Sequence, residues 1–234
     1  SPGAGPKRKV VAGRCPTTRM DASDLRVVAV RDCGPDTVAI EFESPDGFDA
    51  RPGQFVKLTA AVDGEPVSRF YTISSPDVAE SFEITVGYDP EEGGAFSEYL
   101  LALATDDRVQ VAGPFGTNYY EDEPRTVVLA GGPGIGPAVG IAERALADGH
   151  EAAIVYRDDE PVHEARLSAL AAAGVEIYVL GGDEPLTEAV AAVATGAVEE
   201  QLFIYGFESF LDAATEALTA AGGAPDAAKV ENFG

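Results

Sequence analysis

Residues 126–137 read TVVLAGGPGIGP, and this stretch decides how the second half of the chain folds. Its first five residues are apolar without interruption, as in a strand of a parallel sheet that is buried on both faces. The glycine-rich loop that follows opens a helix-like segment, so its backbone N–H groups can approach a phosphate. Open α/β sheets bind their ligands at this end of a strand. We therefore predict a nucleotide-binding loop formed by Gly131, Gly132, Pro133, Gly134, Ile135, Gly136 and Pro137.

Apolar strands and alanine-rich helices alternate from this loop to the last residues of the chain. Such alternation indicates a parallel sheet with helices on both faces. The predicted strands cover residues 126–130, 152–156, 175–180, 202–205 and 228–231, and the predicted helices cover residues 137–147, 162–173, 185–194 and 209–221.

Short alternating runs separated by Gly, Pro and Asp precede the loop. Strands are predicted at residues 25–31, 37–43, 54–60, 67–74, 82–88 and 108–112, with one helix at residues 96–104. Several short strands at this spacing favour an antiparallel barrel or sandwich. A polar, turn-rich boundary lies at residues 119–124. The sequence thus predicts two domains, an antiparallel β-barrel over residues 22–120 and an α/β parallel-sheet domain over residues 125–234.

The charge of the chain is extreme, with 40 acidic residues against 16 basic ones and a net charge of −24. Self-repulsion of this size destabilises a compact state unless salt screens it. We therefore expect a cytoplasmic protein of a halophilic cell rather than a mesophilic protein with one acidic face. The same charge argues against nucleic acids and anionic membranes as partners. No apolar run approaches the roughly 20 residues that a membrane-spanning helix needs.

Residues 1–19 hold five bases and no acid, so the composition changes abruptly after them. We expect this segment to be a disordered tail, a cloning remnant or a mis-assigned start. The two cysteines, Cys15 and Cys33, are too few for a four-thiolate iron–sulfur site or for zinc without further ligands, so no metal is predicted. His150 and His163 are isolated in the sequence and are predicted to lie in a loop and on a helix surface, without a role.

Two stretches of the barrel half carry candidate chemistry, RFYT at residues 69–72 and GGAFS at residues 93–97. Arg69 offers a fixed fork of donors for a diphosphate, Tyr71 a flat face for an aromatic ring, and Thr72 a small donor or acceptor. The second stretch precedes the helix predicted in the barrel half, which makes it another phosphate-compatible helix start. Each stretch alone is ordinary sequence, so only their combination indicates a binding site.

Together these elements resemble the ferredoxin–NADP reductase superfamily over about residues 22–234. RFYT resembles its Arg-x-Tyr-Ser/Thr flavin motif, and GPGIGP at residues 132–137 resembles its Gly-Thr-Gly-Ile-x-Pro nucleotide loop. Four further stretches are similar to family segments: RPGQF (51–55), GAFS (94–97, the Gly-x-x-Ser turn over the flavin diphosphate), GPFG (113–116) and the terminal ENFG (231–234). Ordered motifs at suitable spacing are much more specific than any one of them.

The resemblance implies FAD as the cofactor, NADH or NADPH as the hydride donor, and a role for each matching residue. Arg69 would hold the flavin diphosphate, Tyr71 would pack on the flavin ring, and Thr72 would hydrogen-bond near its N5. The implied flavin contacts are Arg69, Phe70, Tyr71, Thr72, Ser74, Gly94, Ala95, Phe96 and Ser97. The implied catalytic residues are Tyr71, Thr72, Glu231 and Phe233, with Phe233 near the face where nicotinamide enters. Arg157, Asp158, Gly206 and Phe207 would join the loop in binding the nucleotide.

This chain departs from the family pattern in two places. Residues 205–207 read Tyr-Gly-Phe where the family commonly has Cys-Gly-Pro, so the thiol beside the nicotinamide is missing. Residues 87–92 read GYDPEE where the family often carries bases, which leaves FMN as an alternative to FAD. Near the adenine ribose, an acid such as Asp158 would accept from a 2′-hydroxyl and repel a 2′-phosphate, whereas Arg157 would do the reverse. The balance favours NADH over NADPH.

The sequence therefore predicts an oxidoreductase in which NAD(P)H reduces FAD, and electrons pass to a separate acceptor such as a ferredoxin. The acceptor is expected to be separate because two cysteines cannot hold a cluster in this chain. The alternative is a non-catalytic flavin- or nucleotide-binding subunit for electron transfer or sensing. Tyr205 in place of the usual cysteine motivates that alternative.

Overall fold

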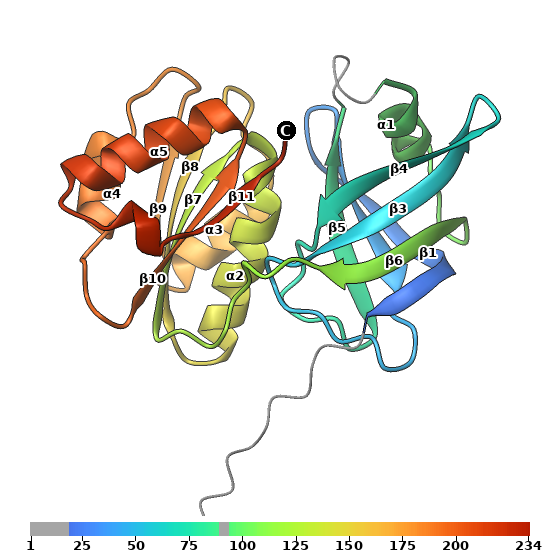
Figure 1. The fold of residues 1–234 in the computed structure, drawn as a ribbon, viewed down its shortest axis with the longest axis horizontal. Coiled ribbons are helices and arrows are strands. Elements are labelled where there is room, and N and C mark those ends of the chain that lie inside the picture. The colour runs from blue at the N-terminus through green and yellow to red at the C-terminus, as the bar shows by residue number, and fades with distance from the viewer. Residues whose placement is uncertain (1–18, 89–93) are drawn as a thin grey trace, which may run out of the picture.

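The computed structural model describes residues 19–88 and 94–234, which form two sheets that lie side by side (Figure 1). The predicted tail, except for Arg19, lies outside the described residues. No helix among the described residues is long and apolar enough to cross a membrane. The fold class is the predicted one: an antiparallel barrel-like sheet is followed by a parallel sheet covered with helices.

The first sheet has six antiparallel strands in the order β4-β3-β6-β1-β2-β5. A bridge between Ile73 and Ile84 joins the segment after β4 to β5, which curls the sheet toward closure. The helix α1 (Gly94–Leu101) packs against β3 and β5. The strands are β1 (Met20–Gly34), β2 (Thr37–Glu43), β3 (Phe55–Val62), β4 (Glu65–Thr72), β5 (Ser81–Gly87) and β6 (Arg108–Phe115).

The hairpin between β3 and β4 sets the register of the RFYT strand. Asp63 and Gly64 have φ angles of 53° and 85°, as a two-residue turn with both central residues at positive φ requires. This turn pairs Tyr71 with Val56, a fully buried core residue of β3. The side chain of Tyr71 therefore packs against the barrel core.

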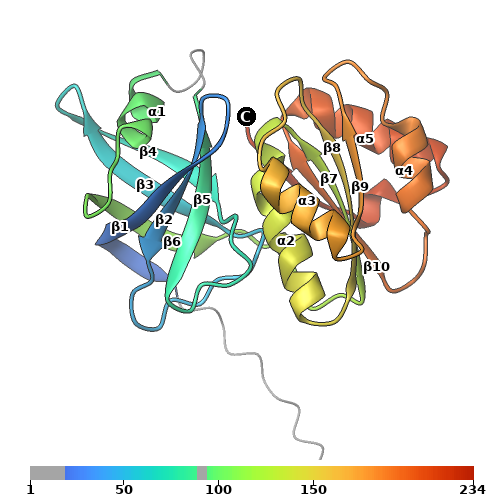
Figure 2. The same ribbon diagram turned by 180° about the vertical axis from the view of Figure 1, so that it is seen from behind.

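The second sheet has five parallel strands in the order β11-β10-β7-β8-β9, and helices cover both of its faces. Helices α2 and α3 pack on one face and α4 and α5 on the other. Figure 2 shows α2 between this sheet and the barrel. The strands are β7 (Arg125–Gly131), β8 (Glu151–Arg157), β9 (Glu176–Leu180), β10 (Glu200–Gly206) and β11 (Lys229–Asn232), and the helices are α2 (Ile135–Ala147), α3 (Glu164–Ala172), α4 (Thr187–Val193) and α5 (Glu208–Ala220), with short 3-10 turns η1 (Gly132–Gly134) and η2 (Pro225–Ala227).

Two element limits differ from the expected ones in ways that bear on the site. The helix expected from residue 137 begins at Ile135, because residues 132–134 form a 3-10 turn that leads directly into it. The strand expected to reach Ser74 ends at Thr72, because Ile73 already pairs with β5 instead. The limits of the two domains, 22–120 and 125–234, stay a prediction.

Candidate functional site

Tyr71 connects the RFYT strand to α1. Its ring stacks on the ring of Phe96, with 6.5 Å between centroids and an interplanar angle of 13°. Burial raises the pKa of Tyr71 to about 12, although nearby Arg69 and a side-chain hydrogen bond with Ser97 act in the opposite direction. The phenol therefore stays protonated at neutral pH. Thr72, the next residue, lies half-buried at the end of the strand.

Arg69 is exposed on the same strand, and among the described residues no acidic side chain forms an ion pair with its guanidinium. Its hydrogen bond within the described part of the chain runs from Nη1 to the backbone oxygen of Ser68, at 3.0 Å. In so acidic a protein, an exposed arginine that pairs with no carboxylate of residues 19–88 and 94–234 is a candidate for binding an external anion.

The start of α1 provides an open backbone next to these residues. Gly94 has a φ angle of 22°, and a Cβ at that position would meet nothing within 4 Å. Ala95 is exposed, whereas the side chains of Phe96 and Ser97 turn inward and are buried. Within this helix start, the first two residues are the ones that a ligand can reach.

Phe70 and Ser74 have partners that differ from those of Tyr71 and Thr72. Phe70 is 59% exposed and meets Phe55 and Phe115 edge-on, at 5.5 and 6.0 Å between ring centroids. Ser74 is fully buried, and its hydroxyl donates to Glu83 at 3.0 Å. The structure therefore gives both residues other partners, and their expected contacts with flavin stay a prediction.

The predicted nucleotide loop combines packed and open glycines. A Cβ at Gly131 would lie 2.3 Å from the Phe210 ring, and a Cβ at Gly134 would lie 2.2 Å from the backbone oxygen of Tyr205. Gly132 has a φ angle of 51° and open space around it, and Pro133 beside it is exposed. The loop is thus held at both ends by packing, while its tip is free to meet a ligand.

The residues after the loop tip bring α2 against the barrel. Ile135, Gly136 and Pro137 are buried, so their predicted nucleotide contact would have to come through the backbone. A Cβ at Gly136 would lie 3.3 Å from Thr85, and a Cβ at Gly140 would lie 2.9 Å from the backbone oxygen of Ser74. These glycines allow the close approach of the helix to the barrel.

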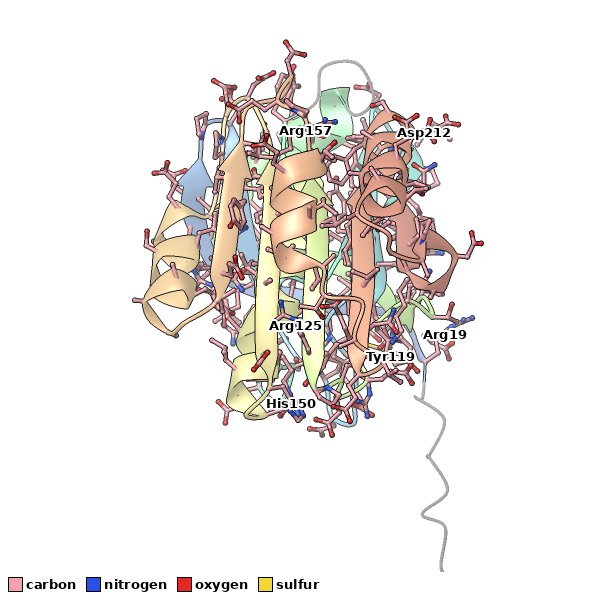
Figure 3. The ribbon with its side chains drawn as sticks, turned by 90° about the vertical axis from the view of Figure 1, so that its left-hand side faces the viewer. Arg19, Tyr119, Arg125, His150, Arg157 and Asp212 are labelled. Atoms are coloured by element: carbon pink, nitrogen blue, oxygen red, sulfur yellow. The ribbon has the colours of Figure 1, made fainter. Side chains whose placement is uncertain are left out.

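Arg157 and Asp158 lie at the carboxyl edge of the parallel sheet, the edge that also carries the loop. Figure 3 shows Arg157 at the opposite end of the sheet from Arg125, the first residue of β7. The guanidinium of Arg157 lies 5.3 Å from the ring centroid of Phe210. The Asp158 carboxylate accepts from the Tyr156 hydroxyl and from the backbone N–H of Glu160, both at 3.0 Å. Asp158 is therefore already engaged within its own loop.

Aromatic rings stack where β10 and β11 end. Phe233 lies 6.4 Å from Tyr205 in a stacked arrangement and 6.3 Å from Phe207 in an edge-on arrangement, measured between centroids. Its backbone N–H donates to the oxygen of Gly206 at 3.1 Å. The structure thus brings together three of the predicted C-terminal residues, Gly206, Phe207 and Phe233.

Tyr205 fills a space between the two sheets. It is fully buried, and its hydroxyl donates to the backbone oxygen of Asn118 at 2.8 Å. A Cβ at Gly53 would lie 2.5 Å from that hydroxyl, so Gly53 leaves room for it. Burial raises the pKa of the nearby Glu231 carboxyl, while a hydrogen bond with Asn118 opposes the shift.

The sequence does not indicate the contact between the barrel and α3, called the joint below, which His163 and Arg166 form with Thr85, Cys33 and Glu83. His163 is 4% exposed, which makes its expected position on a helix surface wrong. Its Nε2 lies 2.7 Å from the Thr85 hydroxyl, and its backbone N–H donates to the oxygen of Cys33. Close by, Arg166 of α3 forms an ion pair with Glu83 of β5 at 2.9 Å. These partners are distant in sequence, so no local pattern indicates them.

His163 makes stability depend on pH. Burial, followed by nearby Arg166, lowers the pKa of His163 to about 4, whereas Glu83 acts in the opposite direction. The unfolded chain binds a proton at this histidine below about pH 6.5 and the folded protein does not, so stability falls as pH drops from about 6.5 to 4. We expect this histidine to contribute about 2–3 kcal/mol to that fall. Urea unfolding of His163→Asn at pH 7 and pH 4.5 measures the contribution, since asparagine tolerates the positive φ at this position.

The matched control is His150→Asn, because His150 is half-buried and bonds to Asp122 rather than to the joint. The control should keep the pH dependence of the wild type. Equal pH dependence in wild type and His163→Asn would show that the histidine carries no such linkage.

The barrel of this chain is similar in sequence to parts of known oxidoreductases. Residues 24–120 match the family model of the oxidoreductase FAD-binding domain. The glycine betaine monooxygenase reductase subunit of Pseudomonas aeruginosa is 42% identical over 104 residues, which cover 43% of this chain and 28% of that protein. Ferredoxin–NADP reductase B of Sorangium cellulosum is 32% identical over 153 residues, which cover 58% of this chain and 62% of that protein. The chain thus spans less than two thirds of either relative.

Solved structures share the fold of the whole described region. The FAD/NAD-binding domain of nitric oxide dioxygenase from Vibrio cholerae has a TM-score of 0.80 at 19% identity, over 92% of this chain and 100% of that one. A ferredoxin NADP+ reductase from Neisseria gonorrhoeae, solved with bound FAD and NADP, has a TM-score of 0.74 at 17% identity, over 91% of this chain and 99% of that one. At these identities the likeness shows the fold alone.

In sequence, the comparisons show a match to the oxidoreductase FAD-binding domain over residues 24–120. For the rest of the chain they show likeness of fold alone. The geometry fits anionic ligands, because no acid among the described residues pairs with Arg69, and Gly94 and Gly132 leave open backbone.

Proposed function

We propose that this chain is an FAD-dependent NAD(P)H oxidoreductase that delivers electrons to a separate acceptor. The observation that carries the proposal is the meeting of the two motifs. Ser74, two residues beyond Thr72, lies against Gly136 and Gly140 of the helix that the glycine loop opens. The expected flavin strand and the expected nucleotide loop are therefore joined at one contact, as a direct transfer between two bound groups requires.

The proposed roles of the residues follow from their positions. Arg69 and the backbone at Gly94 would bind the diphosphate, and Tyr71 and Thr72 would orient the flavin ring. Gly132 and Pro133 would bind the diphosphate of the nucleotide at the start of α2. When bound, FAD supplies the capacity to take up a hydride and to release electrons one at a time. The protein contributes orientation and exclusion of water.

The C-terminal residues have proposed roles in the binding of nicotinamide. We propose that Phe233, which stacks on Tyr205 and meets Phe207 edge-on, covers the place where nicotinamide meets flavin. Glu231 would supply a carboxyl whose pKa is raised by burial, near enough to hydrogen-bond with Asn118. The protein would therefore combine a removable aromatic cover with a half-buried carboxyl group.

NADH is the proposed donor. The Arg157 guanidinium lies over Phe210, and the three residues that follow Arg157 in the sequence are acidic, Asp158, Asp159 and Glu160. These acids repel a 2′-phosphate more than they repel a 2′-hydroxyl. Stopped-flow reduction of the FAD-loaded protein by each nucleotide tests both parts of the proposal. Faster reduction by NADH supports the proposed donor, and faster reduction by NADPH overturns the preference for NADH. If neither nucleotide reduces the flavin, the proposed oxidoreductase activity is overturned.

The acceptor is proposed to be a small electron carrier such as an acidic ferredoxin, in a halophilic cytoplasm. The relatives include a reductase subunit of a monooxygenase and a ferredoxin–NADP reductase, which supports a separate protein acceptor. Two acidic proteins repel each other at low ionic strength. We therefore expect the rate of ferredoxin reduction to rise, by about tenfold between 0.1 M and 2 M salt, as the charges are screened.

The control for this expectation is a neutral one-electron acceptor of small size, whose reduction should change little over the same range. A ferredoxin rate that falls steeply with added salt would contradict the acidic partner.

A non-catalytic subunit for electron transfer or sensing is the second candidate. Tyr205 favours it, because a buried phenol occupies the position of the thiol that adjoins the nicotinamide in the family. Flavin that binds but is not reduced by either nucleotide would select this candidate.

A further inference from the structure

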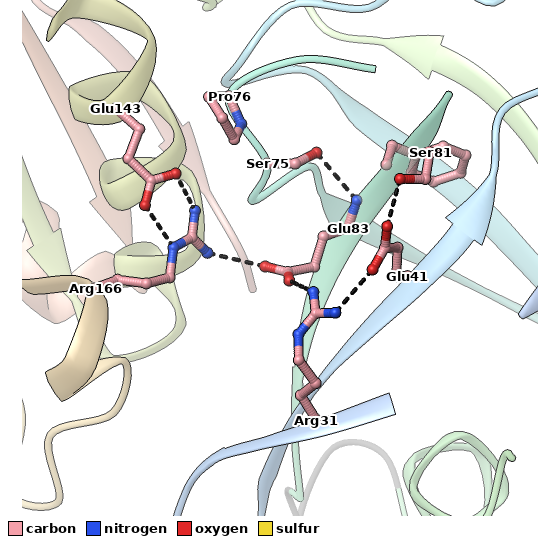
Figure 4. Close-up of a pocket in the computed structure, with 9 residues that line it drawn as sticks. Arg31, Glu41, Ser75, Pro76, Ser81, Glu83, Glu143 and Arg166 are labelled. Atoms are coloured by element: carbon pink, nitrogen blue, oxygen red, sulfur yellow. Dashed lines mark hydrogen bonds and ion pairs between the residues drawn. The ribbon is translucent and has the colours of Figure 1, made fainter. Parts of the chain in front are cut away.

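A network of ion pairs connects the two sheets on the side of α2 and α3. Figure 4 shows Glu83 of β5 between two arginines, Arg31 of β1 and Arg166 of α3. Their guanidinium nitrogens lie 2.6 and 2.9 Å from its carboxylate oxygens. Glu83 is 8% exposed, and the hydroxyl of Ser74 donates to it as well. A carboxylate at this depth is stable because three donors satisfy it.

Arg166 is the member of this network that crosses between the sheets. Its Nε and Nη2 donate to both oxygens of Glu143 in α2, at 2.8 and 2.7 Å. Its Nη1 donates to Glu83, and its Nη2 also donates to the backbone oxygen of Ser74, at 2.6 Å. One planar guanidinium therefore ties two helices of the second sheet to the barrel. Lysine cannot reproduce this fork of donors.

The two ends of this connection lead to the two proposed ligand sites. Glu143 lies on α2, the helix that the glycine loop opens. Ser74 follows Thr72, the residue proposed to bind near the reacting edge of the flavin, by two positions. Gly136 and Gly140 allow α2 to contact the barrel closely at the same place. Because a packed contact transmits displacement, a small movement of Arg166 would change the distance between the two proposed sites.

We propose that Arg166 is a positioning residue that sets the distance between nicotinamide and flavin for hydride transfer. This inference rests on the proposed function. In the proposed function each ligand would bind mainly to residues of its own sheet, so the affinity for each would be set locally. The rate of transfer depends on the relative placement of the two sheets, since misplacement by about 1 Å can cost about 100-fold. Loss of Arg166 should therefore lower the rate constant and leave the affinities in place.

The test compares Arg166→Gln with Arg125→Gln in the full chain loaded with FAD. Arg125 is a suitable control because it also joins several groups, Glu200, Glu151 and the oxygen of Val193, but all of them lie within the second sheet and its connections. Stopped-flow absorbance gives the limiting rate of flavin reduction at saturating NADH and the dissociation constant of NADH. The charge-transfer absorption of the NADH–flavin pair reports their stacking independently of the rate.

We expect Arg166→Gln to lower the limiting rate by about tenfold and to weaken the charge-transfer band, with the dissociation constants of NADH and FAD within about twofold of wild type. Arg166→Lys should recover only part of the rate. Arg125→Gln should keep both the rate and the band. A limiting rate and band in Arg166→Gln equal to those of wild type would overturn the proposal.

Glu143→Gln keeps the test valid should Arg166→Gln fail to fold. This substitution weakens the paired hydrogen bonds from Arg166 to α2 and leaves the ion pair between Arg166 and Glu83 in place. We expect a smaller fall in the limiting rate, again without loss of affinity, and an unchanged rate would also overturn the proposal. Wild-type protein that binds no FAD, or is not reduced by either nucleotide, would instead refute the proposed function itself.

Discussion

Arg69→Gln should weaken FAD binding by about 100-fold, which is the loss expected when about two charge-assisted hydrogen bonds are removed. The arginine is exposed, and it is not occupied by an acid of the described residues, so its replacement should change the fold little. Arg69→Lys should lose about tenfold, because lysine keeps the charge but not the fork. Titration of the apoprotein with FAD, followed by flavin fluorescence, measures both effects.

Arg51→Gln is the matched control for this titration. Arg51 is also an exposed arginine of the barrel, at the turn before β3. Its replacement changes the net charge of the protein equally and should leave the FAD affinity within about twofold, because Arg51 is not among the proposed flavin contacts and the effect of one exposed charge is small. Equal affinities in wild type and Arg69→Gln would remove Arg69 from the flavin site.

The second large effect is expected for Gly134→Ala. A Cβ there would lie 2.2 Å from the backbone oxygen of Tyr205 in β10, so the loop or the strand must move. Its φ angle is −60°, which any residue adopts, and the cost is therefore steric. We expect the free energy of unfolding to fall by about 3 kcal/mol, at the upper end for overpacked sites. Flavin reduction by NADH should slow by about 100-fold as the loop shifts.

Gly181→Ala isolates the steric reason, because the nearest atoms to a Cβ at that glycine begin at 3.8 Å. Urea unfolding and stopped-flow reduction should then give values close to those of wild type. If Gly134→Ala were as stable and as fast as Gly181→Ala, the packing of the loop against β10 would not position the nucleotide.

The sequence was most informative where one local pattern decides one element. The apolar run at residues 126–130 and the glycines after it lie in the structure as a buried strand, a turn and a helix. The alternating strands of the first half pair in one antiparallel sheet. In both cases the periodicity of the side chains follows from the environment of the element, so the sequence alone contains the signal.

The reasons for individual glycines could not be predicted in the same way. The loop pattern suggested that all its glycines face a phosphate, but Gly131 and Gly134 are required by Phe210 and Tyr205, which are more than 70 positions away. Gly140 has no part in the motif, yet it allows α2 to approach Ser74. Close approach is a property of the tertiary structure, and no local pattern encodes it.

The joint between the sheets was missed for a related reason. Arg166 and Glu83 are 83 positions apart, and each alone is an ordinary charged residue of an acidic protein. His163 was expected on a helix surface because it is isolated in the sequence, whereas it contacts Cys33 at the end of β1 and Thr85 of β5. A charged pair that bridges two domains can be recognised only when their arrangement is known.

The most direct test of the proposed oxidoreductase is the visible absorption spectrum of the protein after incubation with FAD and removal of the excess, recorded without oxygen before and after NADH is added. We expect about one retained flavin per chain, with an absorption band that bleaches as NADH reduces it. A protein that retains no flavin would contradict the assignment of the barrel site, and retained flavin that neither NADH nor NADPH bleaches would contradict the proposed oxidoreductase.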